Sequence, residues 1–297
     1  MLKAVRSGFV SIIGRPNVGK SHLLNRILGE KTSIVSEKAQ TTRNKITGIK
    51  TLKEGQIIFI DTPGIYDASS KLGRFLVEQS YSTYNDVDLV LFVTDAGRDT
   101  LERDRSILTT LKGTRVVLAV NKVDLFRKKD HLLEKMAAYR SLYEFEDVVP
   151  ISAKTGENID LLLDTFLKKF PEGPLFFPED MVTDQPEKQI MAEFVREKIF
   201  LLTSNEIPYS SAVVVDSIEP GQKEGVLVVS CTIFIERESQ KGIIIGKKGK
   251  MLKEIGTAAR KEIERRFGSR VVLNLFVKLK KGWTKDSKSL YDLGYQQ

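Results

Sequence analysis

The sequence predicts two domains, an α/β domain with a mostly parallel sheet and a smaller α+β domain after it. Strand-like and helix-like segments alternate over the first part of the chain, and four of the nine prolines fall within residues 171–186. The order of elements changes after those prolines, and a length of 297 residues suits two ordinary domains. Because proline interrupts helices and strands, we expect domains at 1–171 and 187–297, with 172–186 as a linker.

In the first domain, apolar or β-branched runs indicate strands at 8–14, 56–60, 88–94, 115–120 and 147–151. Helix-like stretches alternate with them at 20–28, 71–84, 101–111, 129–142 and 158–169. Such alternation is typical of a parallel sheet covered by helices on both faces. Segment 45–53 reads as an extra strand beside 56–60, with Glu54 and Gly55 as the tight turn between them.

The second domain has a different order of elements. Residues 187–203 are predicted to be helical, because Met191, Val195, Ile199 and Leu202 fall on one face. Two strands are expected at 211–218 and 226–235, an amphipathic helix at 250–267 and a closing strand at 270–279. The order is helix, strand, strand, helix, helix, strand.

Composition narrows the class of protein. Hydrophobic residues make up 41% and charged residues 29%, which is ordinary for a globular protein and excludes a disordered or fibrous chain. No apolar run reaches the length of a membrane span, and the run 9–13 is too short for a signal peptide. One cysteine and two histidines make an internal disulfide or a Cys- or His-rich metal centre unexpected, and they fit a reducing cytoplasm.

The positive charge lies in one part of the chain. Residues 1–240 hold 32 Lys and Arg against 34 Asp and Glu, whereas residues 241–297 hold 15 against 5. A local excess of this kind indicates a site for a polyanion, most often nucleic acid. The alternative is a basic face that only meets solvent.

The segment Gly14-Arg15-Pro16-Asn17-Val18-Gly19-Lys20-Ser21 matches the phosphate-binding loop pattern. It lies between a strand-like run and a helix-like one, which is the context this loop requires. Glycines let backbone N–H groups surround phosphates, and the helix N-terminus adds favourable partial charge. We expect Lys20 to reach the β- and γ-phosphates and the Ser21 hydroxyl to bind Mg²⁺.

Two further segments select the base. Asn121, Lys122 and Asp124 form an NKxD motif at the carboxyl end of a strand, where open α/β sheets bind ligands. The Asp124 carboxylate can accept hydrogen bonds from guanine N1–H and the 2-amino group, a donor pair that adenine lacks. Lys122 can cover the base, and Asn121 can join this loop to the phosphate loop. The run Ser152-Ala153-Lys154 follows the last strand and places a backbone N–H for guanine O6.

The run Asp61-Thr62-Pro63-Gly64 ends another strand. We expect Asp61 to hold Mg²⁺ through water and the Gly64 N–H to sense the γ-phosphate. Upstream, Gln40-Thr41-Thr42-Arg43 supplies a threonine that closes on Mg²⁺ when GTP is bound. Thr42 is favoured over Thr41. Loops ordered by the γ-phosphate are a common switch device.

Over residues 8–170 these motifs resemble the translation-factor-related class of GTPases, which implies GTP hydrolysis with Lys20, Thr42 and Gly64 in the catalytic machinery. Many members carry a water-positioning Gln after the last glycine, whereas this chain has Ile65 there. It resembles the subgroup with a hydrophobic residue at that position. In some of those members an Asn in the phosphate loop helps to bind K⁺, so the resemblance implies a K⁺ site at Asn17. The alternative is that Asn17 only packs the loop.

In the basic domain, Gly246-Lys247-Lys248-Gly249 fits the GxxG loop of a type II KH domain, which clamps single-stranded nucleic acid. Its glycines allow a sugar-phosphate backbone to approach, and its lysines neutralise charge. The expected RNA contacts are Ile243, Ile244 and Ile245 as an apolar wall, followed by Gly246, Lys247, Lys248, Gly249 and Lys250. We expect Trp283 to pack against the last strand rather than stack on a base.

The combination of both domains resembles the Era family of bacterial ribosome-assembly GTPases. The stretches 40–43, 280–283 and 293–295 add to the resemblance. It implies a GTP/GDP switch that binds the 3′ end of small-subunit (16S) rRNA and assists 30S subunit assembly. It also implies a cytoplasmic protein partly on the inner membrane surface, and we expect a monomer. One alternative is a constitutive RNA-binding protein with a structural GTPase domain, and another is a GTPase of tRNA modification or large-subunit assembly.

Overall fold

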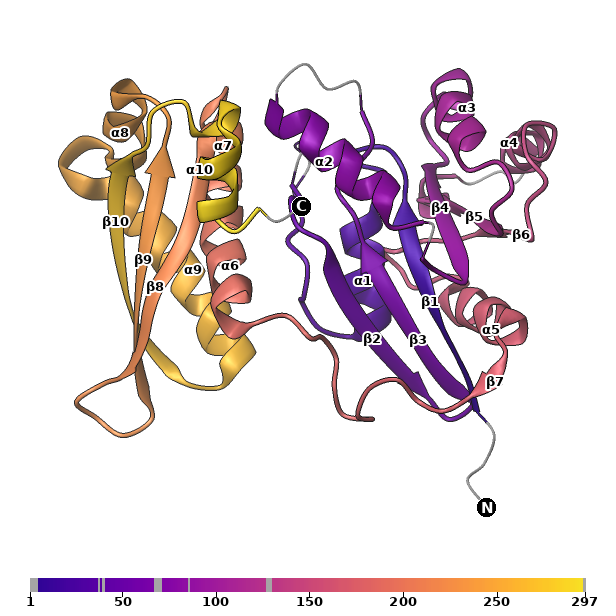
Figure 1. The fold of residues 1–297 in the computed structure, drawn as a ribbon, viewed down its shortest axis with the longest axis horizontal. Coiled ribbons are helices and arrows are strands. Elements are labelled where there is room, and N and C mark those ends of the chain that lie inside the picture. Colours follow the sequence, from indigo (N-terminus) through magenta and orange to yellow (C-terminus); the bar gives the residue numbers. More distant parts are fainter. Residues whose placement is uncertain are drawn as a thin grey trace. The chain divides into compact units, whose positions relative to one another are not determined.

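The computed structural model describes residues 5–36, 38, 41–66, 71–84, 86–126 and 130–295. The chain divides into two compact units, the first ending at Asp184 and the second beginning at Gln185 (Figure 1). The described residues of two short earlier segments, 34–41 and 71–75, also belong to the second unit.

The first unit contains a mostly parallel sheet in the order β2-β3-β1-β4-β5-β6. Strand β2 is antiparallel to β3, as expected for the extra strand joined by a tight turn. These strands are β1 (Val5–Ile13), β2 (Ile46–Leu52), β3 (Gly55–Asp61), β4 (Leu89–Asp95), β5 (Val116–Asn121) and β6 (Asp147–Pro150). The predicted fold class of this domain is confirmed.

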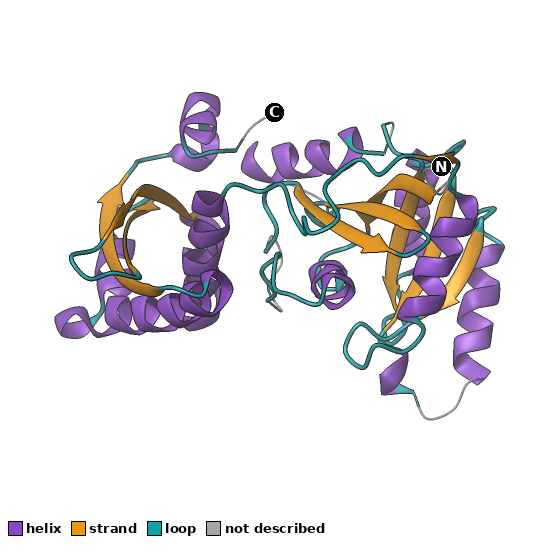
Figure 2. Cartoon of the chain, turned by 90° about the horizontal axis from the view of Figure 1, so that it is seen from below, coloured by secondary structure: helices purple, strands orange, loops and turns teal. Residues whose placement is uncertain are grey.

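Helices cover both faces of this sheet (Figures 1 and 2). Helices α1 (Lys20–Leu28) and α5 (Ile159–Lys169) contribute to the core on one face, and α2 (Lys71–Ser82), α3 (Leu101–Thr110) and α4 (Asp130–Arg140) to the core on the other. Residues of β4 alternate between the two cores, so the whole strand is buried. This explains its continuous apolar run, which is typical of parallel strands buried on both faces.

The segment expected as a linker, 172–186, is bonded to the first unit over much of its length. Strand β7 (Glu172–Gly173) pairs antiparallel with β1. The Gln56 Oε1 atom accepts hydrogen bonds from the N–H groups of Phe176 and Phe177, at 3.0 and 2.9 Å. Further along, the Ile49 N–H donates to Val182 O at 2.8 Å. The prolines therefore end the regular α/β elements, but the segment that contains them stays hydrogen-bonded to the sheet of the first unit.

The second unit has a three-stranded sheet in the order β10-β9-β8, with β8 and β9 antiparallel and β9 and β10 parallel. Helices α6, α8 and α9 pack against one face of it (Figure 2). The element order agrees with the predicted α+β domain. The elements are α6 (Glu187–Leu202), α7 (Ile207–Ser210), β8 (Ser211–Pro220), β9 (Val226–Ile235), α8 (Glu238–Ile245), α9 (Lys250–Phe267), β10 (Arg270–Leu279) and α10 (Ser287–Asp292). The short helices α7 and α10 span too few residues to give a periodic signal.

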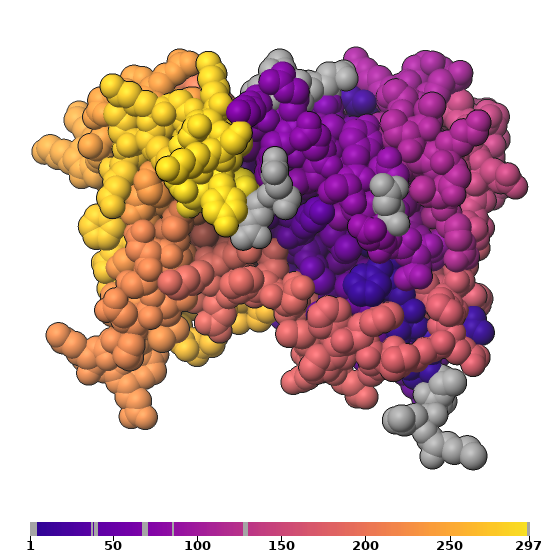
Figure 3. Space-filling model, viewed as in Figure 1, coloured from indigo at the N-terminus to yellow at the C-terminus, as the bar shows by residue number. Residues whose placement is uncertain are grey.

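Trp283 is completely buried in the second unit. Its indole N–H donates to Ser210 O at 2.9 Å, and its ring stacks on Tyr295 with centroids 5.7 Å apart. Figure 3 shows the last residues of the chain, in yellow, covering part of this unit. Packing, rather than base stacking, is therefore the role of Trp283.

The segment 34–41 joins the second unit through α6. The Val35 N–H donates to Glu197 Oε1 at 3.1 Å, and the buried Arg196 guanidinium donates to Thr41 O. Among the described residues, no helix is long and apolar enough to span a membrane.

Candidate functional site

The phosphate loop joins β1 to α1 in the conformation that its glycines permit. Gly14 and Gly19 have φ values of 155° and 102°. A Cβ at Gly14 would lie 2.3 Å from Val93 O, and one at Gly19 would lie 2.3 Å from Asn121 Nδ2. Any larger residue at either position would displace the end of β4 or the Asn121 side chain at the end of β5.

Lys20 begins α1 and is buried, with a side-chain ammonium that donates to Gly14 O at 3.1 Å and to Arg15 O at 3.2 Å. Burial lowers its pKa to about 8, against the opposing charge of Asp61. An ammonium held inside a loop of backbone groups is suited to bind phosphate oxygens.

Four oxygen-bearing side chains meet next to Lys20: Ser21, Ser33, Thr42 and Asp61. The Ser21 hydroxyl donates to Asp61 Oδ2 at 2.8 Å and lies 2.9 Å from Thr42 Oγ1. The Ser33 hydroxyl also donates to Asp61 Oδ2, at 3.0 Å. Burial raises the pKa of Asp61, and the Lys20 charge and these hydrogen bonds oppose that shift.

This cluster suits Mg²⁺, which prefers carboxylate, hydroxyl and water oxygens. Asp61 is fully buried, and its Oδ1 atom has no hydrogen-bond partner among the residues that the structure describes. Thr41 differs from Thr42, since its hydroxyl donates to Lys38 O at 2.6 Å. Gln40, the first residue of that motif, lies outside the described residues.

The segment after Asp61 lies against the phosphate loop. The Ile65 N–H donates to Gly14 O at 3.1 Å, and a Cβ at Gly64 would lie 2.9 Å from Pro16 N. Thr62 and Pro63 are buried; the Thr62 hydroxyl donates to Ile12 O, and Pro63 O accepts from Ser80.

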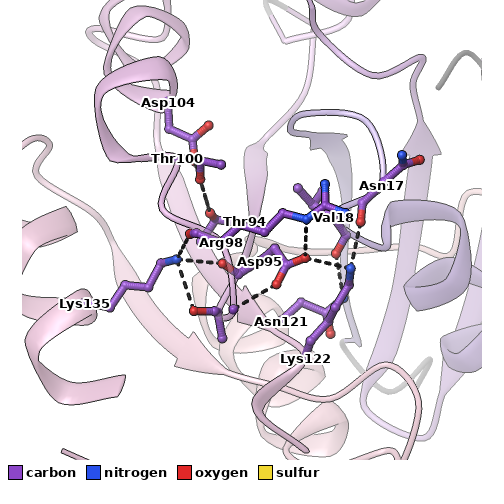
Figure 4. A network of polar contacts seen from close by, with 12 residues as sticks. Asn17, Val18, Thr94, Asp95, Arg98, Thr100, Asp104, Asn121, Lys122 and Lys135 are labelled. Atoms are coloured by element: carbon purple, nitrogen blue, oxygen red, sulfur yellow. Dashed lines mark hydrogen bonds and ion pairs between the residues drawn. The ribbon is translucent and has the colours of Figure 1, made fainter. Parts of the chain in front are cut away.

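The NKxD segment lies at the carboxyl end of β5 and contacts the phosphate loop (Figure 4). The Asn121 amide donates to Val18 O at 2.8 Å, and its Oδ1 accepts from the Ala153 N–H at 2.9 Å. The Lys122 ammonium donates to Asn17 O at 2.8 Å. The Ser152 hydroxyl donates to Asp124 Oδ1 at 2.6 Å, which joins the segment 152–154 to the NKxD segment.

The structure therefore brings together four segments that are far apart in the sequence: the phosphate loop, 61–65, 121–124 and 152–154. The phosphate loop has three partly exposed residues, Arg15, Pro16 and Asn17, and Lys154 is exposed at the end of the segment 152–154. Two further residues contact these segments and were not predicted from the sequence: Arg26, whose guanidinium donates to Ala153 O at 3.1 Å, and Asp95 at the end of β4. The sequence could have indicated Asp95 as a site residue, because it ends an apolar run as Asp61 and Asn121 do.

In the second unit, the GxxG loop lies between α8 and α9. Gly246, Lys248 and Gly249 have positive φ values of 71°, 52° and 79°. A Cβ at Gly246 would lie 2.7 Å from Met251 Cβ, whereas one at Gly249 would meet no atom within 4 Å. Exposed lysines flank these glycines: Lys247, Lys248 and Lys250.

The expected apolar wall needs a correction at Ile244. This side chain has no exposed surface and belongs to the core of the second unit, so it cannot contact a base. Ile243 is half exposed and Ile245 partly exposed. The difference follows from helix α8, which turns successive side chains about 100° apart.

A groove of about 440 Å³ lies between α9 and β10, next to Gly249. Sequence reasoning missed it, although residues 249, 253, 256 and 260 fall on one face of a helix. Gly256 keeps α9 near β10, because a Cβ there would lie 3.3 Å from Leu275 Cδ1. The groove is lined by Gly249, Leu252, Lys253, Gly256, Thr257, Arg260, Val272, Leu273 and Leu275.

Comparisons with known proteins match both parts of the chain. A family described as 50S ribosome-binding GTPase matches residues 9–122, and the KH domain family matches residues 206–284. A protein named GTPase Era from Syntrophus aciditrophicus is 53% identical over 294 residues, which are 98% of this chain and 96% of that protein. GTPase Era from Geobacter metallireducens is 52% identical over 292 residues, 98% of each chain.

Two solved structures are similar over the whole length. One is a variant of Era from Aquifex aeolicus bound to GDP and aluminium fluoride, with 42% identity, a TM-score of 0.95 and coverage of 99% of this chain and 100% of that chain. The other is Era in complex with MgGDPNP and nucleotides 1506–1542 of 16S ribosomal RNA, with the same identity, TM-score and coverage.

Proposed function

The chain belongs to the Era family of GTPases, and from this premise we propose a switch that hydrolyses GTP in its first unit and binds the 3′ region of small-subunit rRNA through its second. The observation that carries the nucleotide part is the meeting of four segments at the carboxyl ends of the strands. They are the phosphate loop with Lys20 and Ser21, the segment 61–64, the NKxD segment 121–124 and the segment 152–154. The phosphate loop would bind the phosphates, the segment 61–64 would bind Mg²⁺ and the γ-phosphate, and the other two segments would bind guanine.

Mg²⁺ would be held by Ser21 and Thr42, with Asp61 acting through water. The arrangement of their oxygens supports this assignment, as does the Asp61 Oδ1 atom, which has no partner within the described part of the chain. When bound, the ion would neutralise charge on the β- and γ-phosphates. Lys20 would donate to those phosphates, and the Gly64 N–H would donate to the γ-phosphate.

A K⁺ ion bound at Asn17 would supply positive charge during hydrolysis. Many GTPases use a glutamine amide to orient water or an arginine guanidinium to stabilise charge at this step. Ile65 is 5% exposed and carries no polar group to orient water, while Asn17 lies on the phosphate loop with a φ of 67°. We expect turnover about tenfold faster in K⁺ than in Na⁺ at equal ionic strength, which corresponds to about 1.4 kcal/mol of transition-state stabilisation. Steady-state phosphate release measures this. Equal rates would leave Asn17 with a packing role only.

Base selection would depend on Asp124. We expect Asp124→Asn to weaken GTP binding about 10- to 100-fold, because a hydrogen bond to a charged group contributes about 1.5–3 kcal/mol. Xanthosine triphosphate should gain affinity, since the new amide can donate to its C2 carbonyl. Competition titrations with GTP, XTP and ATP measure both changes. Asp164→Asn, an exposed change on α5, is the control. Unchanged preference for GTP would contradict the base assignment.

The RNA part is supported by the GxxG loop and the groove beside it. Lys247 and Lys248 supply positive charge on the loop, Lys253 and Arg260 supply it in the groove, and the groove also offers apolar contacts for bases. With the 16S rRNA fragment bound by the similar Era structure, this supports single-stranded rRNA as the ligand. Assistance of 30S assembly, a monomeric state and contact with the inner membrane surface stay predictions.

Nucleotide and RNA binding would be coupled through the segment that precedes Thr42. Residues 35 and 41 are bonded to α6 of the second unit, so ordering Thr42 on Mg²⁺ constrains a segment attached to that helix. A coupling free energy of about 1–3 kcal/mol is typical of linked sites.

The deciding experiment measures RNA affinity in two nucleotide states. The full chain is titrated with the rRNA 3′ oligonucleotide at fixed salt and Mg²⁺, once with GDP and once with GDPNP. We expect binding to be about fivefold or more tighter with GDPNP. Equal affinity would favour the alternative, a constitutive RNA-binding protein with a structural GTPase domain.

A further inference from the structure

Asp95, the last residue of β4, is buried beside the proposed guanine site. Its Oδ2 atom accepts a hydrogen bond from the Lys122 ammonium at 2.7 Å, and its Oδ1 accepts from the Gly97 N–H at 2.9 Å. Arg98 Nε is 3.5 Å from Oδ2 (Figure 4). The carboxylate therefore orders its own loop and holds the lysine of the NKxD motif.

Lys135 on α4 binds the backbone of the same loop. Its ammonium donates to Asp95 O at 2.6 Å, to Ala96 O at 3.3 Å and to Arg98 O (Figure 4). An ammonium has three N–H donors, so all of them can be used on this one turn of backbone. Lys135 thus attaches loop 95–98 to α4.

The loop is also bonded to the base-binding segment. The Ala96 N–H donates to Asn121 O at 2.8 Å, directly beside Lys122. The Lys122 ammonium lies between two acceptors, Asp95 Oδ2 and Asn17 O. Any displacement of loop 95–98 therefore moves one of the two acceptors that hold Lys122.

A buried polar cluster strengthens the attachment to α4. Asp104 Oδ2 accepts hydrogen bonds from Thr94, Thr100 and Tyr139, at 3.0, 2.9 and 2.6 Å. Tyr139 and Lys135 are four residues apart on α4, so they lie on one face of the helix. That face therefore contacts residues before and after Asp95, Thr94 at the end of β4 and Thr100 in the β4–α3 connection.

We propose that Asp95 and Lys135 are positioning residues for guanine nucleotide binding: Lys135 holds loop 95–98, and Asp95 in turn holds the Lys122 ammonium so that its stem covers the base. This inference rests on the proposed nucleotide site. A side chain ordered before binding loses less entropy when the ligand arrives, so the expected result is slower release of the nucleotide.

The test is the rate at which the full chain releases a fluorescent GDP analogue. We expect Asp95→Asn to release it about tenfold faster and Lys135→Met about three- to tenfold faster, the range expected when charge-assisted hydrogen bonds are lost. With Lys135→Met, kcat at saturating GTP should stay within about twofold while KM rises, because Lys135 does not touch the reacting atoms. Lys112→Met, an exposed change in the same unit, is the control.

A double-mutant cycle tests whether Lys135 acts through Lys122. In a Lys122→Ala background, Lys135→Met should cause no further acceleration, since the group it positions is absent. Lys135→Arg should restore part of the slow release. An unchanged release rate in Lys135→Met, or equal acceleration in both backgrounds, would overturn the proposal. Failure of the unmodified chain to bind the analogue would instead overturn the nucleotide site itself.

Discussion

Replacing Lys20 with alanine is expected to reduce GTP affinity at least about 100-fold, the largest effect of any single change in the first unit. The lysine would make charge-assisted hydrogen bonds to two phosphates, each contributing about 1.5–3 kcal/mol. Its ammonium already lies inside the phosphate loop, donating to Gly14 O and Arg15 O. Equilibrium titration with a fluorescent GTP analogue, with Mg²⁺ present, measures the loss.

Two control measurements test whether the effect is specific to the phosphate loop. RNA affinity without nucleotide should be unchanged, because Lys20 belongs to the first unit. Lys112→Ala, at an exposed position of the same unit, should bind GTP normally. Thermal unfolding shows whether the variant stays folded. GTP affinity within about threefold of the unmodified chain would contradict the phosphate-loop assignment.

Gly246→Asp is expected to weaken binding of the rRNA 3′ oligonucleotide at least about 30-fold, or about 2 kcal/mol. A new carboxylate would lie beside Lys247 and Lys248, where it opposes the phosphate backbone. Its Cβ would also press on Met251 Cβ at 2.7 Å, which shifts the start of α9 along the groove. Basal GTP hydrolysis should not change.

Two matched glycine variants separate charge from distortion. Gly249→Asp adds the same charge to the loop, with a similar φ and no atom within 4 Å of the new Cβ. It should weaken RNA binding less than Gly246→Asp. Gly225→Asp lies in the β8–β9 turn, again with open space and a positive φ, and should leave RNA affinity unchanged. Full affinity in Gly246→Asp would exclude the GxxG loop as the RNA contact.

The order and type of the main elements followed from local patterns. Helix α9 was predictable because its apolar residues recur at helical spacing, and β2 because a tight turn joins it to β3. The attachment of residues 172–183 to the first unit was not predictable in this way. It depends on Gln56, more than 100 residues earlier, and no local pattern indicates such a partner.

The same distinction applies to the sites. The phosphate loop and the GxxG loop are visible in the sequence, because their backbone conformations require glycine at fixed spacings. The sequence left two neighbouring threonines as candidates for Mg²⁺. Only the folded chain turns the Thr42 hydroxyl towards Ser21 and the Thr41 hydroxyl towards Lys38.

By itself, then, the sequence determined the two domain types and the residues of four nucleotide-binding segments, because glycine spacing and apolar periodicity act over a few residues. Tertiary structure alone decided that Ile244 is buried, that α9 and β10 enclose a groove, and that Asp95 and Lys135 hold Lys122. These features depend on the direction of side chains and on partners far along the chain. Such partners meet only when strands and helices pack together.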